Sequence, residues 1–290
     1  MPTFRSITVF ALNVVIHEDN KRDYENLFHE SLKLKHVVSF NKTHSALIVG
    51  LSKIQQGASK FITGSIIKYI NIKPPYFDTN KFEILYDEEG NPIQLLPPNI
   101  KGTANTVHFA LDLSTHRVYI DNRFVTPRMA RLFFSEIFEQ AEIVKKFGLV
   151  DVSVHSESKS AEVISKIKTL KKIDVRVMRP NPIGVNRYDE IVLGKLREQN
   201  ADNLSIAISS KGEFLDPNEE FKMYMHAATS HGRIVATILD EEEKRKEIST
   251  DEMPVTHRES IPKNEPYLNA LCRSAIALWG KIREDGNKRV

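Results

Sequence analysis

One acidic residue and one short motif could together support metal-dependent chemistry on phosphodiesters. Asp151 lies six residues before Glu157-Ser158-Lys159. Metal-dependent nucleases of the restriction-endonuclease type place an acidic residue ahead of an E-x-K triplet on adjacent strands, where the carboxylates hold Mg²⁺ and the lysine orients the attacking water. Here Lys159 falls at the expected start of a helix, and such triplets are common by chance. We therefore interpret the pattern as solvated surface and keep a metal-dependent nuclease as an alternative function.

Other motifs that carry chemistry are missing from the sequence. It contains no phosphate-binding G-x-x-x-x-G-K-[ST] or G-x-G-x-x-G loop, no H-E-x-x-H and no G-x-S-x-G. His226 and His231 are five residues apart, which puts them off a common helix face and disfavours a zinc site. The single cysteine, Cys272, lies in an apolar helical stripe that is typical of a buried side chain. The sequence predicts no catalytic residue, no metal ion and no cofactor.

The clearest functional signal is a basic segment. Residues 145–179 hold nine lysines or arginines against four acidic residues, although the whole chain carries a net charge of only +3. The segment is either a solvated, lysine-rich helix face or a surface that contacts nucleic-acid phosphates without reading sequence. Few aromatic residues interleave with the cations, which favours duplex over single-stranded nucleic acid. The candidate binding residues are Lys145, Lys146, Lys166, Lys168, Lys171, Lys172, Arg176 and Arg179.

The elements around the basic segment determine where its side chains point. Apolar residues between 163 and 170 form one narrow stripe of a helix expected over 159–172, which turns the lysines outward. Strands are expected on both sides, over 150–154 and 173–178. Strand, helix and strand with short connections indicate a βαβ unit with parallel strands.

The first part of the chain is typical of a β-rich domain. Residues 73–102 contain five prolines and predict a long irregular connection. The expected elements are strands at 6–16, 45–54 and 61–72, a helix at 19–35, and a hairpin of residues 106–113 and 117–121.

The pattern changes at Thr126, a plausible N-cap followed by Pro127. Residues 204–209 fit a strand or a helix equally well. The other expected elements are helices at 127–147, 188–199, 217–230 and 266–283, and a hairpin of residues 234–239 and 245–249. We predict an α+β protein of two domains: residues 1–123 form a β-rich sheet with one helix, and residues 124–290 form an α/β sandwich with the βαβ unit and the C-terminal helix.

The last helix carries apolar residues at alternating spacings of three and four, as a coiled-coil seam does. This stripe packs either on its own domain or on a second copy of the chain. Its members are Leu268, Leu271, Ala275, Leu278 and Ile282.

Composition limits the class of protein. With 41% hydrophobic and 27% charged residues in 290, the chain is typical of globular proteins. No apolar run approaches the roughly 18 residues that cross a bilayer, and no signal peptide is expected. One cysteine cannot form an internal disulfide, so we expect a cytoplasmic protein without a membrane partner.

Several blocks resemble a family of bacterial proteins of unknown function over nearly the whole chain. The element order is also similar to that of the exclusion protein RexA of phage lambda. The resemblance implies a two-domain, dimeric, sequence-independent duplex-DNA binder that acts in phage exclusion or abortive infection. The sequence leaves open RNA as the ligand and a defence effector protein as a partner. A protein-interaction subunit that senses a phage product is a third reading. The blocks are ALNVVIH, YINIKPPYFD, HFALDLSTHRVYID, KKFGLVDVSV, VRVMRPNP and LREQNA.

Overall fold

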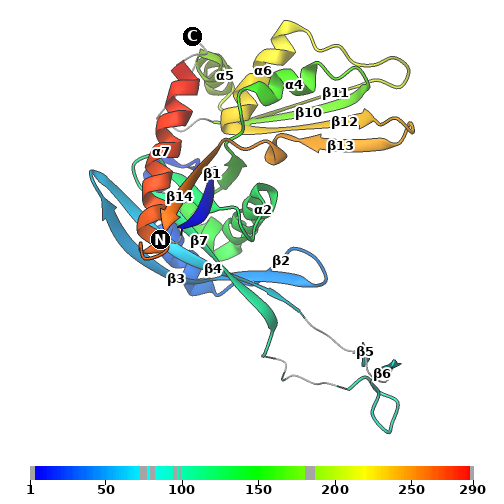
Figure 1. Ribbon diagram of the computed structural model, residues 1–290. Coiled ribbons are helices and arrows are strands. Elements are labelled where there is room, and N and C mark those ends of the chain that lie inside the picture. Colours follow the sequence, from blue (N-terminus) through cyan, green and yellow to red (C-terminus); the bar gives the residue numbers. More distant parts are fainter. Residues whose placement is uncertain are drawn as a thin grey trace.

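The computed structural model describes residues 4–71, 77–78, 82–93, 97, 99–179 and 187–287. They form an α+β fold with two larger antiparallel sheets (Figure 1). The first sheet has the order β14 (Thr256–Pro262), β1 (Phe4–Ile16), β8 (Arg117–Asp121), β7 (Gly102–Asp112), β4 (Ser59–Ile70), β3 (His44–Gln56) and β2 (Val38–Ser39), and β9 (Val150–Val154) also pairs with β1. The second has the order β11 (Asn203–Ser209), β10 (Leu170–Met178), β12 (Gly232–Leu239) and β13 (Arg245–Ser249).

A small hairpin of β5 (Phe77–Asp78) and β6 (Glu83–Ile84) lies apart from both sheets (Figure 1). Two short 3-10 turns, η1 (Asp19–Lys21) and η2 (Thr250–Glu252), precede α1 and follow β13. The helices are α1 (Tyr24–Leu34), α2 (Pro127–Phe138), α3 (Ala141–Phe147), α4 (Lys159–Ser165), α5 (Arg187–Glu198), α6 (Glu219–His231) and α7 (Tyr267–Asn287).

The first sheet is covered on both faces. Side chains alternate across a strand, so Leu12 and Val14 of β1 join one core with α1, α2 and α3, while Val9 and Ala11 join a second core with α7. The apolar stripe of α7 is buried in that second core, where Leu271, Ala275 and Leu278 are fully inaccessible. The stripe therefore packs on the chain's own sheet, and the homodimer stays a prediction.

The second sheet is covered on one face only. Ile173, Val175 and Val177 of β10 pack with α4, α5 and α6. The alternate residues Lys172 and Arg176 point to the other face, on which none of the described helices packs directly (Figure 1). We call this surface of β10–β13 the open face. It turns towards α2 across a cleft.

The predicted βαβ unit was wrong. Strand β9 pairs antiparallel with β1 in the first sheet, whereas β10 pairs antiparallel with β11 and β12 in the second. The predicted helix over 159–172 was also wrong in its second half, because α4 ends at Ser165 and β10 begins at Leu170. Ile173, Val175 and Val177 alternate towards one core, where their β-branched side chains favour a strand, and Leu170 joins the same core across a register shift between Leu170 and Lys172.

Several other expectations can be checked. The predicted hairpins are confirmed as β7–β8 and β12–β13, and residues 203–209 form a strand. Thr126 caps α2 by accepting a hydrogen bond from the backbone N–H of Met129, as predicted, but the expected long helix breaks at Gln140 into α2 and α3. Strand β14 was missed, because its charged sequence gives little apolar alternation.

The predicted domain boundary at residue 123 stays a prediction. The first sheet takes strands β9 and β14 from the second half of the chain, and α2, α3 and α7 pack on it. The predicted irregular connection at 73–102 falls partly outside the described residues.

Candidate functional site

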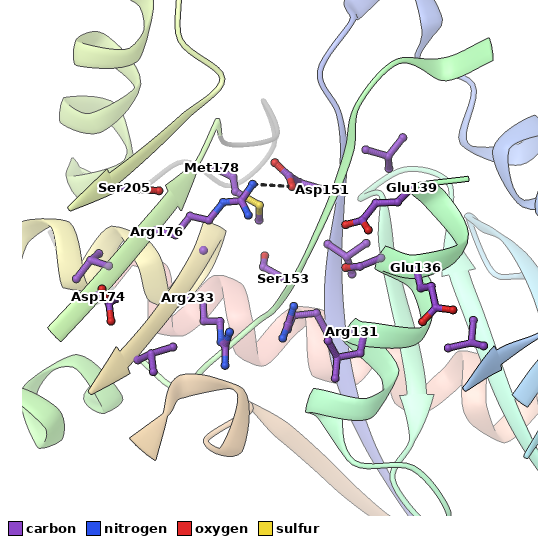
Figure 2. A pocket seen from close by; sticks show the side chains of 18 of the residues that line it. Arg131, Glu136, Glu139, Asp151, Ser153, Asp174, Arg176, Met178, Ser205 and Arg233 are labelled. Atoms are coloured by element: carbon purple, nitrogen blue, oxygen red, sulfur yellow. Dashed lines mark hydrogen bonds and ion pairs between the residues drawn. The ribbon is translucent and has the colours of Figure 1, made fainter. Parts of the chain in front are cut away.

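A cleft of about 670 Å³ lies between the open face and α2 (Figure 2). Its volume falls within the usual range for small-molecule sites, about 300–1,000 Å³. One wall comes from β10, β11 and β12, and the other from β2, α2 and β9. The charged residues that line it are Arg131, Glu136, Glu139, Asp151, Asp174, Arg176 and Arg233.

At one end of the cleft, Asp151 connects the two sheets. His17, directly after β1, donates from Nε2 to Oδ2 of Asp151 at 2.9 Å, and Arg176 of β10 donates from Nη2 to Oδ1 at 3.0 Å. Asp202, before β11, lies 3.6 Å from the other ring nitrogen of His17. Burial by itself raises the pKa of Asp151, but the His17 hydrogen bond and the Arg176 charge outweigh it, so the pKa is lowered. The carboxylate is therefore held ionised between the sheets.

Deeper in the structure, two arginines share one buried carboxylate. The Nε atoms of Arg131 in α2 and Arg233 in β12 lie 2.9 Å and 3.0 Å from Oδ2 of Asp251 in η2. The Asp251 side chain is 1% exposed, Arg131 14% and Arg233 28%. Burial lowers the pKa of Arg233, Asp251 opposes this effect, and Arg131 and Arg128 add to it. Two guanidinium charges thus face one carboxylate at this site.

Ser153 adds a polar group above these arginines (Figure 2). It lies two residues after Asp151 in β9 and so faces the same side, towards the second sheet. Its side chain is almost fully buried, and its hydroxyl has no hydrogen-bond partner among the described residues. A buried hydroxyl without a partner costs free energy, which makes it a candidate for contact with a ligand.

The first four predicted nucleic-acid-binding residues lie outside the cleft. Lys145 and Lys146 are exposed in α3, where Lys146 Nζ forms an ion pair with Glu30 of α1 at 3.2 Å. Lys166 and Lys168 are exposed in the turn after α4 and line a second, shallower hollow beside α6. The structure does not place these lysines on the open face.

The other four predicted residues lie in or directly after β10. Lys171 donates to the carbonyl oxygen of Gly212 at 2.6 Å, and its Nζ lies 4.3 Å from the centre of the Phe214 ring. Lys172 pairs with Asp174 at 2.8 Å on the open face, which it shares with Arg176. Arg179 follows β10. Of the eight residues, the structure brings only Lys172 and Arg176 together on the open face, and the binding role of all eight stays a prediction.

The nuclease-like pattern is spread over two places. Asp151 lines the cleft, whereas Glu157 and Lys159 are exposed at the start of α4. A strand advances about 3.3 Å per residue, so Val154 alone is about 10 Å beyond Asp151. In the part of the chain that the structure describes, no group of three or more His, Cys, Asp or Glu is arranged to hold a metal ion.

Sequence reasoning missed the arginine pair of the cleft and the carboxylate that the pair contacts. Arg131 and Asp251 are 120 residues apart in the chain, and neither belongs to a basic cluster or a known motif. A usable signal was the position of Arg131 itself, a charge between Ala130 and Leu132 in an otherwise apolar stretch of helix. An isolated charge at such a position often has a specific partner.

None of the described helices is long and apolar enough to span a membrane. No curated protein matches the chain. Residues 5–276 match the family model described as Domain of unknown function (DUF4747), so the chain belongs to this family of proteins.

Proposed function

We propose that this protein binds duplex nucleic acid, DNA in the first place, through its phosphates and without reading sequence. The observation that carries the proposal is the open face of the second sheet. Lys172 and Arg176 of β10, Arg233 of β12 and Arg245 of β13 all belong to its outward-facing positions. Asp174 and Glu247 are the acidic residues at equivalent positions, so cations exceed carboxylates within the sheet itself. Asp151 and Asp251 contact Arg176 and Arg233 from outside the sheet.

The small side chains of β11 support contact with a broad, regular ligand. Ser205, Ala207 and Ser209 pair with Arg176, Asp174 and Lys172, so they occupy the same face and leave the longer cations prominent. Contacts to phosphate need positive charges at suitable spacing and no base-reading geometry. Aromatic side chains, which would stack on unpaired bases, are not among these positions.

The resemblance of element order to the phage exclusion protein RexA supports a role in phage exclusion or abortive infection. We place the protein, as a homodimer, in the cytoplasm, where its one buried cysteine needs no partner. Under this proposal, a defence effector protein is a second partner. The metal-dependent nuclease is a weaker candidate, because Glu157 and Lys159 lie outside the cleft that contains Asp151.

Fluorescence anisotropy with several unrelated DNA duplexes, at low and high salt, tests the proposal. The parent protein is expected to bind all duplexes equally, with affinity that falls steeply as salt rises, by a slope of about −0.9 per neutralised phosphate. The double variant Lys172→Glu/Arg245→Glu should bind more weakly and flatten the slope by roughly two units.

Lys42→Glu/Lys60→Glu is the matched control. It changes the total charge equally, but Lys42 and Lys60 are exposed on the first sheet and its connections. A parent that ignores duplexes even at low salt would overturn the proposal and favour the protein-interaction subunit. Equal losses in both double variants would place the binding surface elsewhere. Degradation of the duplex in Mg²⁺, abolished by Glu157→Ala, would instead establish the nuclease.

A further inference from the structure

The arginine pair at the bottom of the cleft has donors that the protein does not use. Each guanidinium carries five N–H donors. Arg131 and Arg233 point their Nε atoms at Asp251, and Arg233 Nε also lies 3.2 Å from the Ser249 hydroxyl. Among the described residues, no hydrogen bond engages the terminal Nη atoms of either arginine. Both side chains line the cleft, where Figure 2 shows their guanidinium ends between the second sheet and α2.

The other charges of the cleft are largely compensated. Arg176 is paired with Asp151, and Asp174 with Lys172. Glu136 lies 3.3 Å from His36. Among the described residues that line the cleft, Arg131 and Arg233 are two partly buried positive charges in contact with a single carboxylate, that of Asp251. Glu247 adds a weaker negative charge near Arg233. The unused donors of the two arginines therefore favour an anion, and a planar fork of N–H groups matches phosphate oxygens.

The walls above the arginines suit the rest of a nucleotide. Phe40, Leu132 and Val235 supply apolar surface, and the Leu132 side chain is 43% exposed. Glu136 of α2 and Glu139, directly after α2, provide carboxylate oxygens that can accept hydrogen bonds from sugar hydroxyls or an exocyclic amino group. The same carboxylates repel a long polyanion, so the interior of the cleft suits a small ligand better than a duplex.

We propose that this cleft binds a nucleotide, with its phosphate held by Arg131, Arg233 and the hydroxyl of Ser153 and its base against the apolar wall. This site goes beyond the duplex binding proposed for the open face, because it uses the interior of the cleft and combines Arg233, which belongs to both surfaces, with Arg131 of α2. Bound phosphate would add the negative charge that Asp251 alone does not supply and would give the Ser153 hydroxyl its missing partner.

Isothermal titration calorimetry with AMP, GMP, CMP and UMP, each beside its nucleoside and inorganic phosphate, tests the site. At least one nucleotide should bind about tenfold more tightly than inorganic phosphate and than its own nucleoside, because both ends of the cleft contribute. Arg131→Gln and Arg233→Gln should each weaken that nucleotide by about 10- to 100-fold, the usual range for a lost charge-assisted contact. Arg258→Gln, an exposed arginine of the first sheet, is the matched control.

Ser153→Ala covers the possibility that the arginine variants fail to fold. The Ser153 hydroxyl makes no hydrogen bond in the described structure, so its removal should leave folding intact and weaken the nucleotide by about three- to tenfold. Failure of all four nucleotides to bind, nucleosides that bind as tightly as nucleotides, or affinities unchanged in Arg131→Gln and Ser153→Ala would each overturn the inference. Nucleotide binding by a parent protein that ignores DNA duplexes even at low salt would reject the open-face proposal alone.

Discussion

The two sheets bury their surfaces in different ways. The first sheet is packed on both faces, with phenylalanine-rich helices on one side and α7 on the other. The second has a core on one face only, and its other face carries charged and small residues beside the cleft. A sheet packed on both faces has no strand surface left for a ligand, whereas a sheet packed on one face can use the other for binding. We therefore expect stability to depend chiefly on the first sheet, and the second sheet is the one on which we propose binding.

The largest effect is expected in the core of the first sheet. Phe134 is fully buried and packs against four other phenylalanine rings, at centroid separations of 5.2–5.8 Å. Phe134→Ala should lower the free energy of unfolding by about 3–5 kcal/mol, because it removes apolar contacts and leaves a cavity. Urea unfolding measures the change. Leu132→Ala, on the exposed side of the same helix, is the control, with an expected change of about 0.5 kcal/mol. Similar losses in both variants would mean that α2 does not have one buried side and one exposed side.

A smaller loss is expected where α6 passes into β12. A Cβ atom at Gly232 would lie 1.9 Å from the backbone oxygen of Arg176, so Gly232→Ala must push β12 away from β10. We expect the free energy of unfolding to fall by about 1–3 kcal/mol. Gly212→Ala, where a Cβ meets nothing within 4 Å, should stay near the parent value. If Gly232→Ala unfolds at the same urea concentration as the parent, β10 and β12 can move apart at this point without a loss of stability, which contradicts the prediction.

The stability that the Asp151 contacts between the two sheets contribute should depend on pH. Asp151→Asn removes the charge that His17 and Arg176 contact, and we expect a loss of about 1–2 kcal/mol at pH 7. The folded pKa of Asp151 is lowered, so its stabilisation is present above the unfolded pKa of about 3.9 and is lost as pH falls through the folded pKa. The difference between parent and variant, measured by urea unfolding from pH 7 to pH 2.5, should therefore shrink below pH 4.

Asp174→Asn is the control for this pH series. Asp174 pairs with Lys172 on the open face, where 42% of its side chain is exposed, so its removal should cost at most about 1 kcal/mol. If the loss of unfolding free energy in Asp151→Asn stays constant down to the lowest pH, the loss comes from changed packing around this side chain and not from the missing carboxylate charge.

The smallest effect is expected on the outer side of α7. Gly280 is exposed in the helix interior, and a Cβ there meets nothing within 4 Å. Gly280→Ala should raise the free energy of unfolding by about 0.5–1 kcal/mol, because alanine loses less backbone entropy in a helix. Thermal and urea unfolding both measure this gain. A loss instead would indicate that the outward side of α7 is covered by another surface, such as a second copy of the chain.

The sequence by itself determined the elements whose side chains follow one period. The alternation in β1 predicts a strand, and the Thr126-Pro127 pair predicts the start of α2. Neighbouring strand-like runs predict both hairpins. These features depend on neighbours within a few residues, so a short stretch of sequence is enough to predict them. The same reasoning failed at residues 166–172, where lysine-rich sequence fits a helix or a strand and the pairing with β11 and β12 decides for the strand.

Only the tertiary structure decided where the cleft lies and which charges meet in it. Asp151 and Arg176 were both noted in the sequence, but their ion pair depends on β9 joining the first sheet and β10 the second. Arg131, Arg233 and Asp251 come from a helix, a strand and a turn that are distant in the chain. Charge density along a sequence measures neighbours in the chain, whereas a binding site depends on neighbours in space, and long-range strand pairing brought these three residues together.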